Sequence, residues 1–308
     1  MKKGLVLKST GSWYLVKIDN GSLINCKAKG KLRTFDIKST NPISVGDWVD
    51  IEEADKETSV IAHIYDRKNY IIRKASNLSK QSHIIAANVD QAVLVITLAF
   101  PETQLEFIDR FLVSCEAYRI PVLIVINKTD LYEDSLKNLI TEIYEIYEPI
   151  GCQVIETSAI NRKNLDVLKL KLKDKVSVLS GNSGVGKSTL VNSLYPNLNL
   201  KVGEISNYHL KGKHTTTFAE MFELPEGGYI IDTPGIKGFG MVYMNKSEIY
   251  HFFPEIFKLA ASCQYHNCLH VEEPKCAVKS AVKEGKISLS VGLIIGMVTS
   301  PVGCSSLL

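Results

Sequence analysis

The sequence feature that most constrains the fold is the octet Gly181-Asn-Ser-Gly-Val-Gly-Lys187-Ser188, which matches the pattern G-x-x-x-x-G-K-S. An apolar run at 176–179 precedes it, and a helix-like stretch at 187–194 begins at its end. Glycines let successive backbone N–H groups turn toward bound phosphates, and the N-terminus of a helix favours negative charge. We therefore predict a strand, a phosphate-binding loop and a helix. The predicted nucleotide contacts here are Gly181, Asn182, Ser183, Gly184, Val185, Gly186, Lys187, Ser188 and Thr189.

Two residues of this octet have predicted chemical roles. Lys187 is expected to neutralise the β- and γ-phosphate oxygens as a catalytic group, and Ser188 is expected to give an oxygen to Mg²⁺.

From about residue 90 onward, apolar runs alternate with amphipathic stretches. Continuous Val, Ile and Leu runs are typical of strands that are covered on both faces, so we predict a mostly parallel sheet with helices on each side. The predicted strands are 92–97, 122–126, 154–155, 176–179 and 229–231, and the predicted helices are 102–118, 133–148, 163–173 and 187–194.

A second motif, Asn127-Lys-Thr-Asp130, follows the strand predicted at 122–126. A carboxylate such as that of Asp130 can accept hydrogen bonds from N1–H and the 2-amino group of guanine, which adenine does not offer. This favours GTP and disfavours an ATP-using enzyme. Thr157-Ser158-Ala159 follows the next strand and could add a backbone N–H to the guanine oxygen. The predicted base contacts are Asn127, Lys128, Thr129, Asp130, Ser158 and Ala159.

Two further segments are candidates for sensing the γ-phosphate. Asp232-Thr-Pro-Gly235 follows a predicted strand, so Asp232 is expected to hold Mg²⁺ through water and Gly235 to present its N–H to the γ-phosphate. The polar segment 211–217 contains three threonines; Thr216 is our candidate for completing the Mg²⁺ shell, although the choice of threonine stays open.

Hydrolysis needs a group that orients the attacking water. Ile236 stands after Gly235, where many GTPases have a glutamine, and isoleucine cannot do this. We expect slow intrinsic hydrolysis, with the missing group supplied by His214, another loop residue or a bound partner.

The motifs occur in a permuted order. The guanine motif and the Ser-Ala segment precede the phosphate loop, whereas common GTPases begin with that loop. As a result, the segment after Gly235 leads directly into the C-terminal part of the chain.

Residues 1–66 consist of short apolar runs separated by glycine-containing turns, which predicts a small antiparallel β-barrel. An OB-fold and a generic barrel both fit this pattern. Residues 1–38 contain nine Lys or Arg and two Asp, so this part could face an anionic partner. The basic segment 67–80 is interpreted as a linker.

Three cysteines and a histidine are grouped near the C-terminus as Cys263-x4-Cys268-x-His270-x5-Cys276. Three thiolates and an imidazole can close a tetrahedral Zn²⁺ site with no open position, which predicts a structural metal. His266 is a competing ligand. The lysine-rich helix expected at 275–284 is either a nucleic-acid contact or a solvated face.

The permuted order, the N-terminal barrel and the cysteine cluster together resemble the RsgA (YjeQ) family of small-ribosomal-subunit-dependent GTPases. The resemblance spans about residues 1–290. It implies an N-terminal OB-fold, a central α/β circularly permuted P-loop GTPase domain and a small, α-rich zinc-binding domain. We place these domains at 1–66, 67–240 and 241–308.

The resemblance also implies a function. Family membership implies binding to the 30S subunit and its 16S rRNA, and GTP hydrolysis that is stimulated by this subunit during late maturation and the release of assembly factors. We expect a cytoplasmic monomer without membrane attachment. A GTP-dependent RNA-binding or scaffold protein with negligible turnover is the alternative. The uncharged tail 291–308 departs from the charged end typical of the family.

Overall fold

The computed structural model describes residues 1–33, 42–55, 58–74, 82–198, 219–232, 250–270 and 273–287. Its N-terminal strands form a closed barrel. They are β1 (Lys2–Ser9), β2 (Tyr14–Ile18), β3 (Leu23–Ala28), β4 (Trp48–Asp55) and β5 (Thr58–Ile64). Their order is β1-β2-β3-β5-β4, and β4 pairs again with β1, so that the sheet closes. The parallel pairing of β3 with β5 completes the five-stranded topology of an OB-fold.

The barrel interior follows the two-residue alternation of its strands. In β2, Tyr14, Val16 and Ile18 are buried, whereas Leu15 and Lys17 between them are partly exposed. Residues of period two point to one face of a strand, so the apolar set meets inside the barrel. The remaining buried members of this core are Val6, Cys26, Ala28, Ile43, Val49, Ile51 and Ile61.

The segment expected to be a linker, 67–80, is in part a strand. Residues Tyr70–Lys74 form β6, which pairs antiparallel with β7 (Ser82–Ala87). The linker prediction is wrong for these residues because Ile71, which lies between Lys68 and Arg73 in the sequence, is buried in the central core. Arg67, at the beginning of this segment, is also tied to the fold. Its Nε and a terminal nitrogen donate hydrogen bonds to the buried Asp47 carboxylate at 2.6 and 2.7 Å.

The central sheet is mostly parallel, as predicted. Its strands are β8 (Gln91–Ile96), β9 (Val122–Ile126), β10 (Gln153–Glu156), β11 (Val176–Ser180) and β13 (Tyr229–Asp232), in the order β10-β9-β8-β11-β13. An antiparallel strand that was not predicted from the sequence, β12 (Glu220–Glu223), follows β13 in the sheet. The helices around this sheet are α1 (Leu105–Ala117), α2 (Asp134–Tyr147), α3 (Leu165–Leu172) and α4 (Lys187–Leu194).

Both faces of the central sheet are covered. In β8, Leu94 belongs to an apolar core that includes Ile108 of α1 and Ile143 of α2. The next residue, Val95, belongs to a second core that includes Leu168 of α3 and Leu190 of α4. This explains why the strand sequences are continuously apolar.

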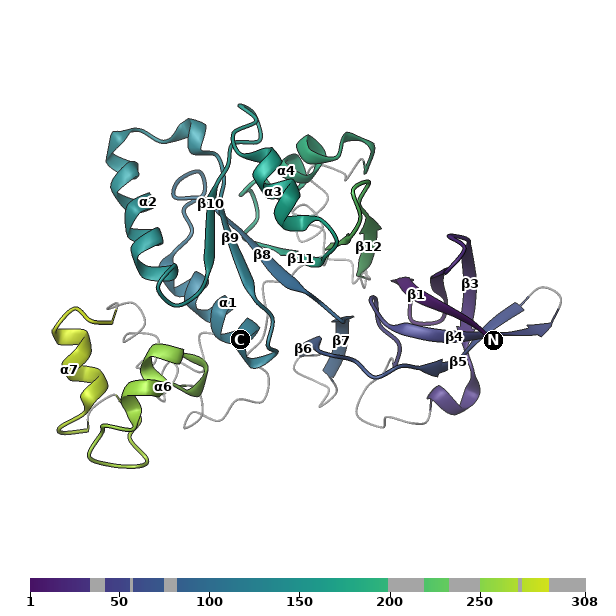
Figure 1. Cartoon of the computed structure of the whole chain (residues 1–308), viewed down its shortest axis with the longest axis horizontal. Coiled ribbons are helices and arrows are strands. Elements are labelled where there is room, and N and C mark those ends of the chain that lie inside the picture. The colour runs from purple at the N-terminus through teal and green to yellow at the C-terminus, as the bar shows by residue number, and fades with distance from the viewer. Residues whose placement is uncertain are drawn as a thin grey trace, which may run out of the picture.

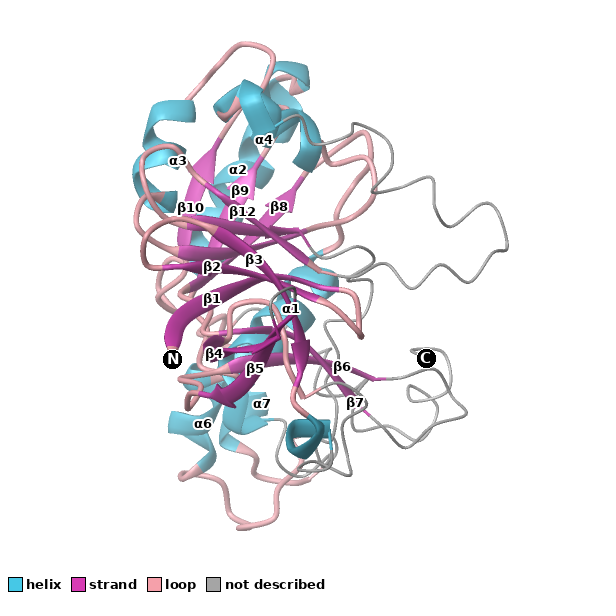
Figure 2. Cartoon of the chain, turned by 90° about the vertical axis from the view of Figure 1, so that its right-hand side faces the viewer, coloured by secondary structure: helices cyan, strands magenta, loops and turns pink. Residues whose placement is uncertain are grey.

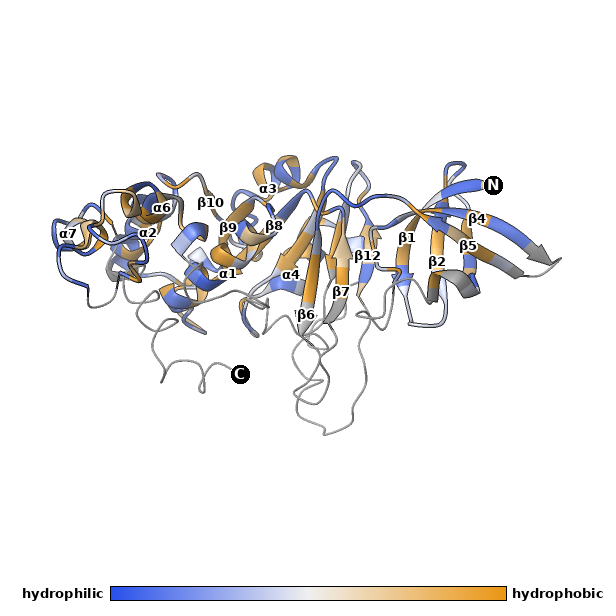
Figure 3. Cartoon of the chain, turned by 90° about the horizontal axis from the view of Figure 1, so that it is seen from below, coloured by the Kyte–Doolittle hydropathy of each residue, from blue (hydrophilic) through white to orange (hydrophobic). Residues whose placement is uncertain are grey.

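The barrel and the central sheet are hydrogen-bonded to each other. Strand β1 pairs antiparallel with β12 at Lys8 and Glu220, which joins both parts into one 11-stranded sheet. Figures 1 and 3 show β12 between the strands of the barrel and those of the central sheet, and Figure 2 views the molecule from the end that carries the barrel. We call this junction between β1 and β12 the seam. Two ion pairs cross it, from Lys8 to Glu220 at 2.8 Å and from Lys17 to Glu223 at 2.5 Å.

The C-terminal module contains α6 (Pro254–Ala260) and α7 (Ala277–Lys283) and packs against α1. Its core combines Phe253, Ile256 and Val278 with Val113 of α1. Figure 1 shows this module and the barrel at opposite ends of the central domain. Within the described parts of the chain, no helix has the length and apolar character needed to cross a membrane.

Candidate functional site

The phosphate-loop residues connect β11 to α4, as predicted. Three glycines in this loop have positive φ angles: 140° at Gly181, 85° at Gly184 and 91° at Gly186. A Cβ atom on Gly181 would lie 2.1 Å from the carbonyl oxygen of Val95 in β8. Glycine is therefore required here both for backbone conformation and for space.

The charged and hydroxyl groups of the octet lie at the beginning of α4. Lys187 folds back over the loop, and its Nζ donates to the carbonyl oxygens of Gly181 at 2.7 Å and Asn182 at 2.8 Å. Ser188 is in the first helical turn and is buried. The ammonium group thus lies within the turn whose backbone forms the predicted phosphate cradle.

The guanine motif lies beside the phosphate loop. Asn127 follows β9 and is buried, and its Nδ2 donates to the carbonyl oxygen of Val185 at 2.9 Å. Its Oδ1 accepts a hydrogen bond from the Thr157 hydroxyl at 3.1 Å. One amide side chain therefore connects the guanine motif, the phosphate loop and the Ser-Ala segment.

The Ser-Ala segment also orients the acidic residue of the motif. The Ser158 hydroxyl donates to Asp130 Oδ1 at 2.5 Å and accepts from the backbone N–H of Asn161 at 3.0 Å. The backbone N–H and the hydroxyl of Thr129 both donate to the carbonyl oxygen of Thr157, at 3.2 and 3.1 Å. These bonds hold the short helix η2 (Thr129–Leu131), which carries Asp130, against the end of β10.

Lys128 is held differently from its neighbours in the motif. Its backbone is left-handed, with φ at 61°, and its Nζ donates to the carbonyl oxygen of Phe100 at 2.5 Å. Phe100 lies in the loop after β8 (residues 97–104, called the β8 loop), which was not predicted to belong to the site. Its carbonyl oxygen is backbone and has no sequence signature, so residue patterns could not have indicated this contact.

The γ-phosphate segments are only partly within the described residues. Asp232 ends β13 and pairs in register with Leu179 of β11, two positions before the phosphate loop. Its backbone is thus at the expected edge of the sheet. The candidates His214, Thr216 and Gly235, together with Ile236 and the tail 291–308, lie outside the described residues.

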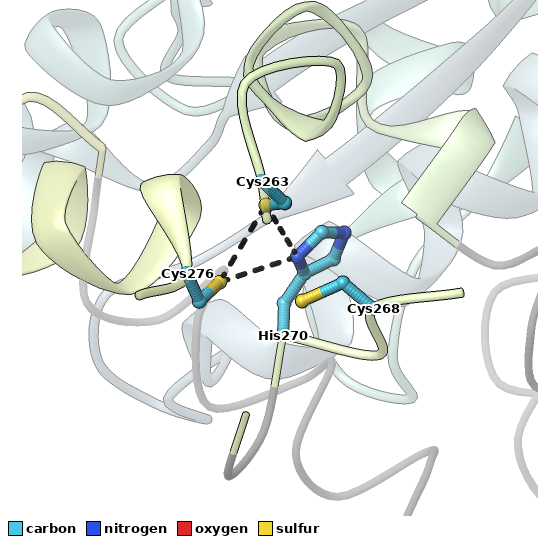
Figure 4. A group of neighbouring side chains, drawn as sticks. All are labelled: Cys263, Cys268, His270 and Cys276. Atoms are coloured by element: carbon cyan, nitrogen blue, oxygen red, sulfur yellow. Dashed lines mark hydrogen bonds between the residues drawn. The ribbon is translucent and has the colours of Figure 1, made fainter. Parts of the chain in front are cut away.

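The predicted metal ligands come together in the C-terminal module. One ligand atom from each of Cys263, Cys268, His270 and Cys276 lies within 4.8 Å of the others. His270 Nδ1 is 3.6 Å from the sulfur of Cys263 and 3.4 Å from that of Cys276, and these two sulfurs are 3.8 Å apart (Figure 4). The competing ligand His266 is exposed and is not part of the group.

The donor set fits a metal ion. In a tetrahedral site with sulfur at about 2.3 Å from the metal, two sulfurs are about 3.8 Å apart. The distance between Cys263 and Cys276 equals this value. Figure 4 shows all four side chains directed at one point, and α7 begins immediately after Cys276. The cluster could therefore hold a metal ion between the end of α6 and the beginning of α7.

These features define a class of protein: a circularly permuted GTPase with an N-terminal OB-fold and a C-terminal Cys/His metal cluster. Residues 3–61 match the model of the RsgA N-terminal domain, and residues 64–242 match that of the RsgA GTPase. The chain belongs to the RsgA GTPase family. Its activity is accordingly that of a GTP hydrolase, which disfavours the scaffold alternative.

Individual relatives agree with this assignment. The chain is 56% identical over 288 residues to the small ribosomal subunit biogenesis GTPase RsgA of Bacteroides fragilis strain YCH46, covering 94% of this chain and 93% of that protein. It is 50% identical to the protein of the same name from Flavobacterium johnsoniae, covering 93% and 89%.

Solved structures agree as well. YjeQ from Thermotoga maritima superimposes with a TM-score of 0.78 at 34% identity, covering 96% of this chain and 95% of that chain. YloQ, described as a circularly permuted GTPase, gives 0.73 at 30% identity, covering 96% and 92%.

Proposed function

We propose that this GTPase binds the small (30S) ribosomal subunit and couples GTP hydrolysis to late maturation of that subunit and to the release of assembly factors. The relatives are named for small ribosomal subunit biogenesis. The observation that carries the proposal is the seam between β1 and β12. This seam joins the barrel, which is suited to nucleic acid, to β12. Strand β12 lies in the sequence between the segment 211–217 and the motif 232–235, which are proposed to respond to the γ-phosphate.

The seam gives a physical route for this coupling. Strand β12 follows the threonine segment 211–217, and its partner β13 ends at Asp232, where the D-x-P-G motif begins. A shift of the β12–β13 hairpin on hydrolysis therefore acts on β1 through one backbone pairing and two ion pairs. An RNA partner held by the barrel is then sensitive to the nucleotide state.

The nucleotide in this proposal is GTP or GDP. The Asp130 carboxylate accepts from N1–H and the 2-amino group of guanine, while Ser158 holds that carboxylate and Ala159 presents a backbone N–H. The backbone of residues 181–189 binds the phosphates, and Lys187 exchanges its loop carbonyls for the β- and γ-phosphate oxygens.

The proposed metals have separate roles. Mg²⁺ neutralises phosphate charge when GTP is bound; Ser188 and Thr216 would hold it directly and Asp232 through water. Zn²⁺ would be structural in the Cys263, Cys268, His270 and Cys276 cluster, because four protein ligands leave no position for a substrate.

Hydrolysis itself is proposed to depend on the ribosomal partner. The N–H of Gly235 contacts the γ-phosphate, and because Ile236 cannot orient water, His214 or a partner group supplies that function. Without the partner the rate is then slow.

The barrel surface is suited to 16S rRNA. Of the basic side chains on β1 and β3, Lys3 lies over the exposed rings of Trp48 and Tyr65 at 5.1 and 4.6 Å, and Lys27 lies over Trp13 at 4.5 Å. Exposed aromatic rings stack on unpaired bases, and adjacent ammonium groups contact phosphates. We further propose that the protein acts as a monomer in the cytoplasm.

The test is the GTPase rate of the purified protein alone and with 30S, 50S or 70S particles at fixed salt. We expect a low intrinsic rate that rises at least about tenfold with 30S particles and much less with 50S particles, in line with stimulation by a group supplied in trans. An equal rate with and without 30S particles would contradict the proposal.

A further inference from the structure

Tyr132, two residues after Asp130, makes two backbone hydrogen bonds inside the nucleotide site. Its hydroxyl donates to the carbonyl oxygen of Asn127 at 2.6 Å and accepts from the backbone N–H of Leu98 at 2.9 Å. One oxygen atom thus connects the first residue of the guanine motif to the β8 loop.

The β8 loop is itself fixed to the other parts of the site. The backbone N–H of Thr103 donates to the carbonyl oxygen of Thr97 at 2.8 Å, and the Thr97 hydroxyl donates to the carbonyl oxygen of Pro101. The Pro101 ring lies 3.3 Å from the position of a Cβ on Gly184 in the phosphate loop. The same loop provides the Phe100 oxygen that Lys128 binds. It therefore touches the phosphate loop and the guanine motif together.

The chemistry of the Tyr132 hydroxyl suits this position. Burial raises the pKa of Tyr132 to about 12, so the phenol keeps its proton at neutral pH and can donate and accept at once. Phenylalanine would keep the ring but leave the Asn127 carbonyl and the Leu98 N–H without this partner. A protein backbone group that loses its partner away from water is destabilised, and the segment that carries it moves to find another.

We propose that Tyr132 is a positioning residue for guanine recognition, which holds the guanine motif in register with the β8 loop and the phosphate loop. It acts on the nucleotide indirectly, through the backbone groups of Asn127 and Leu98 that its hydroxyl binds. Because Asn127 directly precedes Lys128 and η2, a shift of its backbone displaces Asp130 relative to the base. The inference rests on the proposed guanine contacts of Asp130.

Base selectivity separates this role from a merely structural one. GDP offers the 2-amino group of guanine to Asp130, whereas IDP lacks it, so the ratio of their dissociation constants reports the fit of the carboxylate to the base. Loss of one aligned hydrogen bond changes an affinity by about tenfold. We expect Tyr132→Phe to weaken GDP binding by about tenfold, to weaken IDP binding less, and so to reduce the ratio.

The matched control is Tyr147→Phe. Tyr147 is also buried, and its hydroxyl donates to Asp109 at 2.7 Å, but it lies at the end of α2, away from the motifs. This variant should lower the thermal midpoint and leave both dissociation constants unchanged. Thr97→Val, which keeps the side-chain shape and removes the bond to Pro101, should reproduce the loss of selectivity from the other side of the β8 loop.

The experiment is isothermal titration of GDP and IDP into the wild-type protein and the three variants, with a thermal midpoint for each. A selectivity ratio that Tyr132→Phe and Thr97→Val leave unchanged overturns the inference, as does a change that Tyr147→Phe shares. Failure of the wild-type protein to bind GDP would instead contradict the proposed nucleotide site. If Tyr132→Phe does not fold, Thr97→Val decides the outcome.

Discussion

Asn127 and Val185 are 58 positions apart in the chain, and a hydrogen bond of 2.9 Å from Asn127 Nδ2 to the Val185 carbonyl oxygen joins them. In the permuted order the guanine motif comes first and the phosphate loop later. Their contact therefore depends on the adjacency of the three strands β9, β8 and β11. The site forms only when the whole sheet is assembled.

Asn127→Ala tests this contact. The change removes the donor to the Val185 carbonyl oxygen in a buried site and leaves the Thr157 hydroxyl with only its longer bond to the Ile126 carbonyl oxygen, at 3.4 Å. We expect GDP affinity to fall by roughly 30- to 100-fold, which corresponds to about 2–3 kcal/mol for two lost bonds. Titration calorimetry measures the change, and Asn25→Ala on the exposed side of β3 is the control. An unchanged affinity would contradict the role of Asn127 as the connection.

Lys17→Glu tests the seam between barrel and central sheet. It places like charges opposite Glu223, and the double variant Lys17→Glu with Glu223→Lys restores the pair. Because Glu223 is half exposed, we expect an effect on unfolding free energy below about 1 kcal/mol. We expect a larger loss of stimulation by 30S particles, recovered in the double variant. Stimulation that is equal in all three proteins would argue against coupling through β12.

The same ion pair predicts a pH dependence. Its hydrogen bond to Glu223 raises the pKa of Lys17 above the ordinary 10.5. The native state then binds the proton more tightly than the unfolded state, so this stabilisation is complete below pH 10.5 and is lost as pH rises through the higher native pKa. Urea unfolding at pH 9 and pH 11 should show a smaller alkaline loss in Lys17→Gln than in the wild type.

Glu255, at the beginning of α6, should destabilise the junction between the C-terminal module and α1 at neutral pH. Burial raises its pKa above the ordinary 4.5, and its Oε2 has no hydrogen-bond partner within the described residues. Its unfavourable contribution grows as pH rises from 4.5 through the native pKa. Glu255→Gln should therefore stabilise the protein at pH 8, by about 0.5–1 kcal/mol, and less at pH 5. Exposed Glu145→Gln is the control, and urea midpoints measure both.

Removal of the metal should unfold the C-terminal module before the rest of the chain. Cys268 and Cys276 belong to the same apolar core as Phe253 and Ile256, so loss of the bound ion frees the segments that form this core. Cys276→Ser should lower the zinc content, measured by mass spectrometry, and raise amide exchange in residues 250–287. Cys152→Ser, outside the cluster, should keep the zinc. Full zinc content in Cys276→Ser would contradict the predicted ligand set.

The parts of the site that the sequence predicts are those with local signatures. Gly181 and Gly186 are glycines because of their φ angles, and the four metal ligands lie in one short segment. The spacing alone did not decide between His266 and His270. The fold decided it by burying one imidazole beside the thiols and exposing the other.

The parts that the sequence did not predict depend on long-range contacts. Strand β12 is only four residues long, and its partner β1 is about 212 positions away, so its sequence carries no signal for that pairing. Likewise, the basic residues around β6 led to its interpretation as part of a linker. Tyr132 contacts backbone atoms of Asn127 and Leu98, which no residue type indicates. Only folding brings these groups together, and no spacing rule describes them.

The pairing of β1 with β12 also bears on solubility. Beyond β12 the central sheet would present an open edge, and unpaired strand edges promote association between molecules. Strand β1 occupies part of this edge, and Leu5 and Leu7 on the same strand complete the apolar core of the central domain. A GTPase domain expressed without its barrel would therefore expose an unpaired, aggregation-prone sheet edge and would lack part of its apolar core. We therefore expect the two domains to stay soluble only when they are expressed together.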